Sequence, residues 1–306
     1  MVIATAMVKI VAAIILGYFL YKIHILNEQV DGTISQLVIY AAGPCMIFSS
    51  IMDLDRGNEA EILRLIISGF GIYILFAVLA FLGAKLLRPG KSRQGVYEAI
   101  LMFGNTAFLA FPIGEALMGS VGVSYLAILN VFQTVLAFSY GIFLLTKGNA
   151  GTFKFTPKKL ISPGNISAVI AIIMYFAGVK LPDLVMAPID FIGQLTSPLA
   201  MLVIGGTIAG YSLKSLFNNW RYYAAALMKL IVFPLIAFFI ARAVWGPGDL
   251  ARVITIHCAM PTAVIITMIA VTYKADYETT SSATGLMDIL CIGTIPLVWA
   301  VISSFM

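Results

Sequence analysis

Apolar runs long enough to cross a lipid bilayer recur along the whole chain, separated by short polar breaks. A helix needs about 20 apolar residues to cross the hydrocarbon core. The breaks leave no room for a separate soluble domain. The pattern predicts an all-α membrane protein with ten transmembrane helices, at residues 3–21, 34–52, 62–86, 96–118, 123–146, 164–182, 188–210, 222–245, 251–273 and 281–304.

Composition supports this prediction. Hydrophobic residues make up 61% and charged residues 11% of the 306 positions, whereas roughly 25% of residues are charged in ordinary soluble domains. Cys45, Cys258 and Cys291 all lie within predicted spans, and no Cys-x-x-Cys pair occurs. We therefore expect no metal site and no cofactor other than a coupling H⁺ or Na⁺. The net charge of +5 is spread over short loops, so membrane lipid and not nucleic acid is the expected surrounding.

The distribution of basic residues predicts the orientation, because cytoplasmic loops are enriched in Lys and Arg. Most of them follow the odd-numbered spans: Lys22, Lys85, Arg88, Lys91, Arg93, Lys147, Lys154, Lys158, Lys159, Lys214, Arg221 and Lys274. The odd-numbered connections, including the one between the fifth and sixth spans, are therefore predicted to be cytoplasmic. Both termini are then extracytoplasmic, and the expected location is the cell (inner) membrane.

The longest polar break, at 147–163, separates two halves, 1–146 and 164–306, with five predicted spans each. Spans in equivalent order carry related features, such as Pro44 in the second and Pro198 in the seventh. Because five is an odd number, the second half enters the membrane from the opposite face. The prediction is a 5+5 inverted repeat, in which equivalent interrupted spans mark the substrate site of a transporter.

The fourth and ninth spans are the interrupted pair. Glycine is permissive in backbone angle and proline lacks an amide hydrogen, so we expect both helices to open near mid-membrane. Free N–H groups at half-helix N-termini favour an anion. Glycine and proline also occur in membrane helices as simple kinks, which is the alternative. The predicted substrate-binding residues are Gly104, Asn105, Thr106, Pro261 and Thr262, with Asn130 and Gln133 from one face of the fifth span.

Ionisable residues within spans are candidates for ion coupling. Asp288 lies deep in the tenth span and is the first candidate to bind a proton or another cation; its alternative is a structural pair with Lys229 or His257. His257 either titrates near neutral pH or is satisfied by a neighbour. Lys229 either counters an anionic substrate or anchors its helix. Glu115 follows the fourth-span break toward the outer mouth.

Four segments resemble the auxin efflux carrier family. "GNTAFLAFPIGEAL" is similar to its fourth-span motif, and "TSPLAMLVIGGTIAG", "LMKLIVFPLIA" and "HCAMPTAVI" are similar to its seventh, eighth and ninth spans. The family includes plant PIN-type carriers and bacterial permeases associated with malate, malonate and similar organic anions. The likeness follows the whole chain in order, and the short central break suits a bacterial member.

The resemblance implies a sodium/proton-antiporter-like fold with broken crossover helices at the fourth and ninth spans. A scaffold domain (spans 1, 2, 6 and 7) then supports a mobile transport domain (spans 3–5 and 8–10), with a homodimer through the scaffold. The resemblance assigns substrate contact to Asn105, and Pro261 matches the ninth-span crossover proline. Gly104 stands where the plant carriers have proline, and Ala107 and Ala110 replace common glycines, so the pocket is expected to differ in shape.

The predicted function is a secondary active transporter that exports or exchanges a small organic anion by elevator-type alternating access. The expected substrate is a carboxylate, for which a dicarboxylate or an indole-3-acetate-like molecule is a candidate. An intramembrane enzyme is disfavoured, because the chain lacks His-Glu-x-x-His and Gly-x-Ser-x-Gly motifs and a second deep aspartate. A sensor or a channel on the same fold is the alternative that the sequence leaves open.

Overall fold

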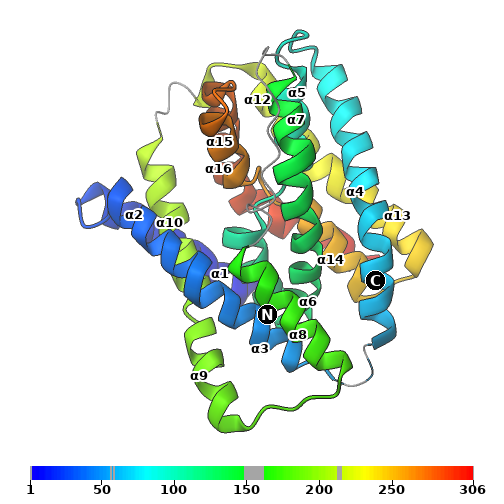
Figure 1. The fold of residues 1–306 in the computed structure, drawn as a ribbon. Helices are drawn as coiled ribbons and strands as arrows, with labels where there is room; N and C mark the ends of the chain where they lie inside the picture. Colours follow the sequence, from blue (N-terminus) through cyan, green and yellow to red (C-terminus); the bar gives the residue numbers. More distant parts are fainter. Residues whose placement is uncertain (1, 56, 58, 148–161, 212–215, 306) are drawn as a thin grey trace. The chain divides into compact units, whose positions relative to one another are not determined.

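The computed structural model describes residues 2–55, 57, 59–147, 162–211 and 216–305. The elements in these residues are helices (Figure 1), together with one isolated two-residue β-bridge. Most of the predicted connection 147–163, with Lys154, Lys158 and Lys159, lies outside the described residues.

Six helical segments in the described part of the chain are long and apolar enough to cross a membrane: Glu28–Met52, Glu59–Leu87, Thr106–Thr146, Asp183–Gly210, Trp220–Trp245 and Tyr277–Ser303. Helices also occupy the other predicted spans. These are α1 (Val2–Lys22), α5 (Gln94–Met102), α8 (Pro163–Phe176), α14 (Asp249–Cys258) and α15 (Val264–Thr272). The prediction of an all-helical, multi-pass membrane protein is confirmed.

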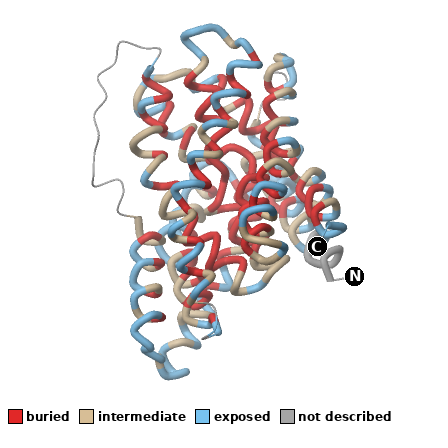
Figure 2. The backbone as a smooth tube through the Cα atoms, turned by 90° about the vertical axis from the view of Figure 1, so that its right-hand side faces the viewer, coloured by how far each residue is buried: buried red, intermediate tan, exposed pale blue. Residues whose placement is uncertain are grey.

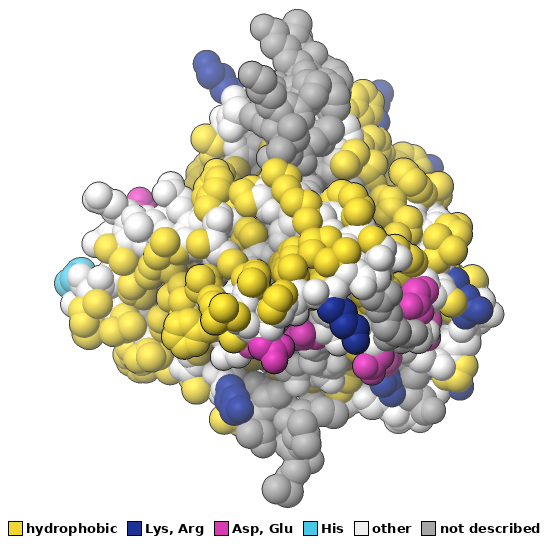
Figure 3. Space-filling model, turned by 60° about the horizontal axis from the view of Figure 1, so that its bottom comes forward, with side chains coloured by type: hydrophobic (Ala, Val, Ile, Leu, Met, Phe, Trp, Pro, Cys, Tyr) yellow, Lys and Arg dark blue, Asp and Glu magenta, His cyan; other side chains and the backbone are white. Residues whose placement is uncertain are grey.

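The surfaces of these helices are those of a protein in lipid. Buried and exposed positions alternate along the helices (Figure 2), yet many exposed positions are large and apolar. On α4 (Glu59–Leu87), Ile67, Phe70 and Ile74 are each about two-thirds exposed. Hydrophobic side chains cover much of the face in Figure 3. Extended apolar surface of this kind marks contact with a membrane or with a partner.

The helices form two compact units. Unit 1 contains Met1–Ile67, Thr106–Val131 and Ile161–Gly210, and unit 2 contains Ser68–Asn105, Phe132–Leu160 and Tyr211–Met306. Each unit therefore combines segments that lie far apart in the sequence.

Unit 1 is built around close helix contacts. α1 packs along α10 (Thr196–Gly210), and α3 (Gly43–Met52) packs against α8 and α9 (Asp183–Gly193). A Cβ atom on Gly17 or Gly205 would overlap the backbone of the facing helix. Small residues at such contacts let membrane helices approach closely, so these two glycines set the separation of α1 and α10.

α6 (Phe111–Leu136), which begins in unit 1, changes direction at Gly119. This glycine has φ 62° and ψ −150°, which are not helical angles. A Cβ atom on Gly122 would overlap the carbonyl group of Gly114, although eight residues of a straight helix span about 12 Å. The chain therefore turns back near Gly119, which agrees with the predicted boundary between residues 118 and 123.

In unit 2, α16 (Tyr277–Ser303) is the helix that contacts most of the others. It packs against α5, α12 (Trp220–Leu227), the π-helix η5 (Met228–Val232), α13 (Phe233–Trp245), α14 and α15. α5 also packs against the short helix α7 (Ile142–Thr146). This arrangement brings the ends of four short helices, α5, α7, α14 and α15, into one unit.

Candidate functional site

Two helices of unit 2 are interrupted inside its buried interior. α5 ends at Met102, and Phe103 is extended with φ −95° and ψ 125°. α14 ends at Cys258, and α15 begins only at Val264, after Ala263 in an extended conformation. The sequence predicted openings near Gly104 and Pro261, which lie within these two segments.

The two interruptions pair with each other. Gly104 and Thr262 form an isolated antiparallel β-bridge. Two backbone hydrogen bonds flank it: Asn105 N–H donates to the Pro261 carbonyl at 2.8 Å, and Ala263 N–H donates to the Phe103 carbonyl at 3.0 Å. Backbone groups released from a helix must find partners in a membrane, where an unpaired group costs several kcal/mol. Each interruption therefore supplies partners for the other.

Gln133 completes the pairing of Gly104. Its side-chain Nε2 donates to the Gly104 carbonyl at 2.8 Å, and its Oε1 accepts from the Gly104 N–H at 3.2 Å. The sequence predicted Gln133 as a substrate-binding residue. In the structure, the side-chain amide of Gln133 instead forms hydrogen bonds with the backbone N–H and carbonyl groups of Gly104. Residue types alone do not indicate this partner.

Side chains also satisfy carbonyl groups at the end of α5. Thr262 Oγ1 donates to the Ile100 carbonyl at 3.0 Å, and Lys229 Nζ donates to the Met102 carbonyl at 3.2 Å. Lys229 is 1% exposed. A cation is favourable at a helix C-terminus, where the backbone dipoles leave partial negative charge. Lys229 thus lies against the end of α5.

Gly104 lies in close contact with the end of α14. A Cβ atom at this position would lie 3.0 Å from the His257 carbonyl oxygen and 3.1 Å from Met260 Cβ. His257 itself is buried, with Nε2 2.7 Å from the Tyr73 hydroxyl oxygen and its ring stacked on Phe76. The end of α14 therefore packs directly on the interruption in α5.

Asp288 lies on α16 and is 3% exposed. Its Oδ1 has no hydrogen-bond partner among the described residues, and Tyr211 is the polar side chain beside its carboxyl group. Lys229 and His257 form their described hydrogen bonds elsewhere.

The remaining predicted residues fall in unit 1. Thr106 is buried, and Asn130 Nδ2 is 3.5 Å from Asn165 Oδ1. Glu115 accepts a hydrogen bond from the Ser197 hydroxyl. The structure thus brings Gly104, Asn105, Gln133, Pro261, Thr262, His257 and Lys229 together in unit 2, and it places Asn130 and Glu115 in the other unit.

Glu115 lines a pocket of about 180 Å³ in unit 1 together with Asp53 and Asp190. Partial burial raises the pKa of Asp53, and the negative charge of Asp190 raises it further. Sequence reasoning did not single out Asp53 or Asp190, because they lie just outside or near the end of predicted spans and not deep within them.

Six apolar helical segments of membrane-spanning length in the described residues define a multi-pass membrane protein. The chain belongs to the membrane transport protein family, which matches residues 2–154 and 149–299. This match, together with relatives named as transporters, confirms the resemblance to the auxin efflux carriers and indicates a transporter in place of an enzyme.

Three relatives cover nearly the whole chain. An uncharacterised transporter of Methanocaldococcus jannaschii is 26% identical over 278 residues, 88% of this chain and 89% of that protein. A second uncharacterised transporter, of Methanothermobacter thermautotrophicus, is 23% identical over 297 residues, 96% of each chain. A Rhizobium meliloti protein provisionally named a malonate transporter is 22% identical over 294 residues, 92% of this chain and 90% of that protein.

Proposed function

We propose that the protein is a secondary carrier for a small organic anion, and that the anion binds beside the paired helix interruptions. The observation that carries this proposal is the Gly104–Thr262 bridge, which holds two helix interruptions together in a buried region. Interrupted helices of this kind supply the ion and substrate sites of many secondary transporters.

The local charge favours an anion. α15 begins at the interruption, and its N-cap residue Ala263 provides no side-chain hydrogen bond to the first turn. The N-terminus of a helix carries partial positive charge and free N–H groups. The buried Lys229 offsets the opposite partial charge at the end of α5. The buried Asn105 is proposed to contact the substrate directly, with Thr106 beside it in the sequence.

A carboxylate is the proposed substrate class, and a short dicarboxylate is its first representative. The name of the Rhizobium meliloti relative supports this choice. We further propose that the chain crosses the membrane ten times as a 5+5 inverted repeat. Spans 1, 2, 6 and 7 form a scaffold through which two copies associate, and spans 3–5 and 8–10 move against it in an elevator movement. The odd-numbered connections lie in the cytoplasm.

A thermal-shift screen of the purified protein tests the proposal. The ligands are malonate, malate, monocarboxylates and indole-3-acetate, each with and without sodium. A ligand that binds the folded protein stabilises it by about 2.7 kcal/mol at one hundred times its Kd, so the unfolding temperature rises with ligand concentration. Saturable uptake and counterflow of the same anion in proteoliposomes would distinguish a carrier from a sensor or a channel. A screen without any carboxylate-dependent shift would contradict the proposal.

A further inference from the structure

Asp288 is a buried acid without a counter-charge among the described residues. The helices packed on α16 carry these charged or titratable groups: Glu98 on α5, Arg221 on α12, Lys229 on η5, Arg242 on α13, and Asp249, Arg252 and His257 on α14. None of them forms an ion pair or a hydrogen bond with Asp288 in the described part of the chain; the titratable groups near its carboxyl group are Tyr211 and Cys291. An ionised carboxylate so placed is strongly unfavourable. Its free Oδ1 therefore needs a ligand that brings positive charge.

A file of hydroxyl groups leads to Asp288 along one face of α16. Thr280, Thr284 and Asp288 are spaced by four residues, and each is at most 3% exposed. Thr267 of α15 adds a hydroxyl 3.5 Å from that of Thr284. Residues four apart share a helix face, and eight residues of helix span about 12 Å. The file therefore reaches from the first turn of α16 to the buried carboxyl group.

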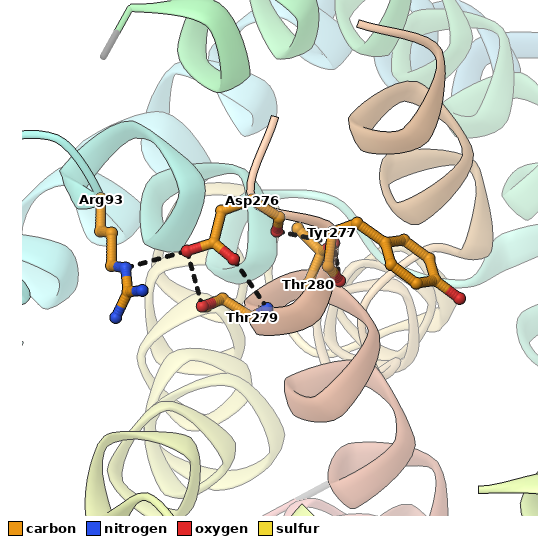
Figure 4. A network of polar contacts seen from close by, with 5 residues as sticks. All are labelled: Arg93, Asp276, Tyr277, Thr279 and Thr280. Carbon is orange, nitrogen blue, oxygen red and sulfur yellow. Dashed lines mark hydrogen bonds and ion pairs between the residues drawn. The ribbon is translucent and has the colours of Figure 1, made fainter. Parts of the chain in front are cut away.

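The outer end of this file is polar and accessible. Asp276 caps α16 by accepting hydrogen bonds from the Thr279 N–H at 3.0 Å and from its hydroxyl at 2.8 Å. Arg93, at the start of α5, pairs with Asp276 at 2.9 Å (Figure 4), and the two side chains are 56% and 23% exposed. Thr280 donates its hydroxyl to backbone carbonyl groups of the same turn (Figure 4). Water at this end reaches Arg93 and Asp276, and the buried Thr280 hydroxyl lies one helical turn further in.

We propose that Asp288 binds a proton, which enters at the α15–α16 connection and reaches the carboxyl group past Thr280 and Thr284. The carboxylate oxygen accepts the proton and becomes a neutral acid, so one negative charge disappears from the interior of unit 2. A proton needs only the one Oδ1 atom that has no hydrogen-bond partner among the described residues, whereas those residues contain no group of three or more His, Cys, Asp or Glu side chains that could hold a transition metal. Entry from the cytoplasm rests on the proposed function and its orientation, whereas the proton site itself does not.

Infrared difference spectroscopy on the purified protein without substrate tests the site. A protonated carboxylic acid has a C=O band that shifts in D₂O, and we expect this band to be lost in Asp288→Asn. A band that persists unchanged in Asp288→Asn, or that is absent from the wild-type protein, would overturn the proposal. A band that disappears when sodium is added at constant pH would assign the site to sodium instead.

The exchange rate of this band tests the path. After transfer to D₂O, Thr284→Val should slow the shift by about tenfold relative to the wild-type protein, and Thr284→Ser should restore it. Thr272→Val is the matched control, because this exposed α15 hydroxyl donates to its own helix at the Met268 carbonyl. If Thr284→Val does not fold, the exchange rate is measured in Thr280→Val instead. A folded variant whose band exchanges at the wild-type rate would contradict the proposed passage of the proton past these hydroxyl groups. Because no substrate is present, these results do not depend on the thermal-shift screen.

Discussion

The chain contains two kinds of helix interruption, and their surroundings differ. At Gly119 the helix opens where it is exposed, and a Cβ atom there would meet nothing within 4 Å. At Gly104 the helix opens in the buried interior, where another interrupted helix and the Gln133 side chain pair its backbone. The first interruption turns the chain. The second holds opened backbone groups in a fixed arrangement with polar side chains, which the turn at Gly119 lacks in the described contacts.

The largest expected effect comes from removing the side chain that pairs Gly104. Gln133→Leu leaves both an N–H and a C=O of Gly104 buried without partners, so the free energy of unfolding should fall by about 2–5 kcal/mol. Gln194→Leu is the control, because this exposed glutamine at the C-cap of α9 donates its described side-chain hydrogen bond to Asp190 in the last turn of that helix. Its effect should stay within about 0.5 kcal/mol. Denaturant unfolding in detergent measures both. Equal effects would show that Gly104 does not depend on Gln133.

Filling the close contact at Gly104 should have the next largest effect. Gly104→Ala forces its new methyl group against His257 and Met260, at a cost of about 1–3 kcal/mol. Gly71→Ala on α4 has nothing within 4 Å of the new atom and should stabilise the helix by about 0.5–1 kcal/mol. Thermal unfolding compares the two variants. A neutral Gly104→Ala would mean that the interrupted helices are packed loosely.

A smaller effect, on binding, is expected at Asn105. Asn105→Ala should weaken binding of the anion found in the screen by at least tenfold, which corresponds to about 1.4 kcal/mol. Because Asn105 is buried, unfolding without ligand is measured as well, so that a loss of affinity is separated from a loss of stability. Asn218→Ala, at an exposed loop position, is the matched control. Equal affinities of Asn105→Ala and the wild-type protein in a direct binding assay would remove Asn105 from the site.

The smallest effect is expected in the acidic pocket of unit 1. Because the pKa of Asp53 is raised in the folded protein, the folded state holds this proton more tightly than the unfolded chain does. Its contribution therefore favours folding at low pH and is lost as pH rises through the raised pKa. Asp53→Asn should remove this loss, so that the variant becomes more stable relative to the wild-type protein as pH rises above the unfolded-state pKa of 3.8. Asp249→Asn, on an exposed ion pair, is the control. A profile identical to that of the wild-type protein would contradict this.

The sequence predicted the interruptions because their causes are local. Glycine at 104 and proline at 261 change backbone preferences wherever they occur. The partners of the opened backbone could not be predicted, because Gln133 and Lys229 reach backbone groups that lie near them only in the folded chain. Likewise, Asn130 and Gln133 lie three residues apart and were predicted to share a helix face, but they belong to different units. Local chemistry indicates where a helix opens, and only tertiary structure shows what closes the gap.

The Gly104–Thr262 bridge also has a consequence for biosynthesis. Its two positions lie far apart along the chain, so the ribosome completes α5 well before the segment that pairs with it exists. Until residues 261–263 enter the membrane, the backbone at 103–105 lacks those partners, and the N-terminal half cannot reach its mature packing on its own. Nascent chains that stop before α14 should therefore be exposed to quality-control proteases, whereas chains that extend past α15 should gain resistance in a single late step.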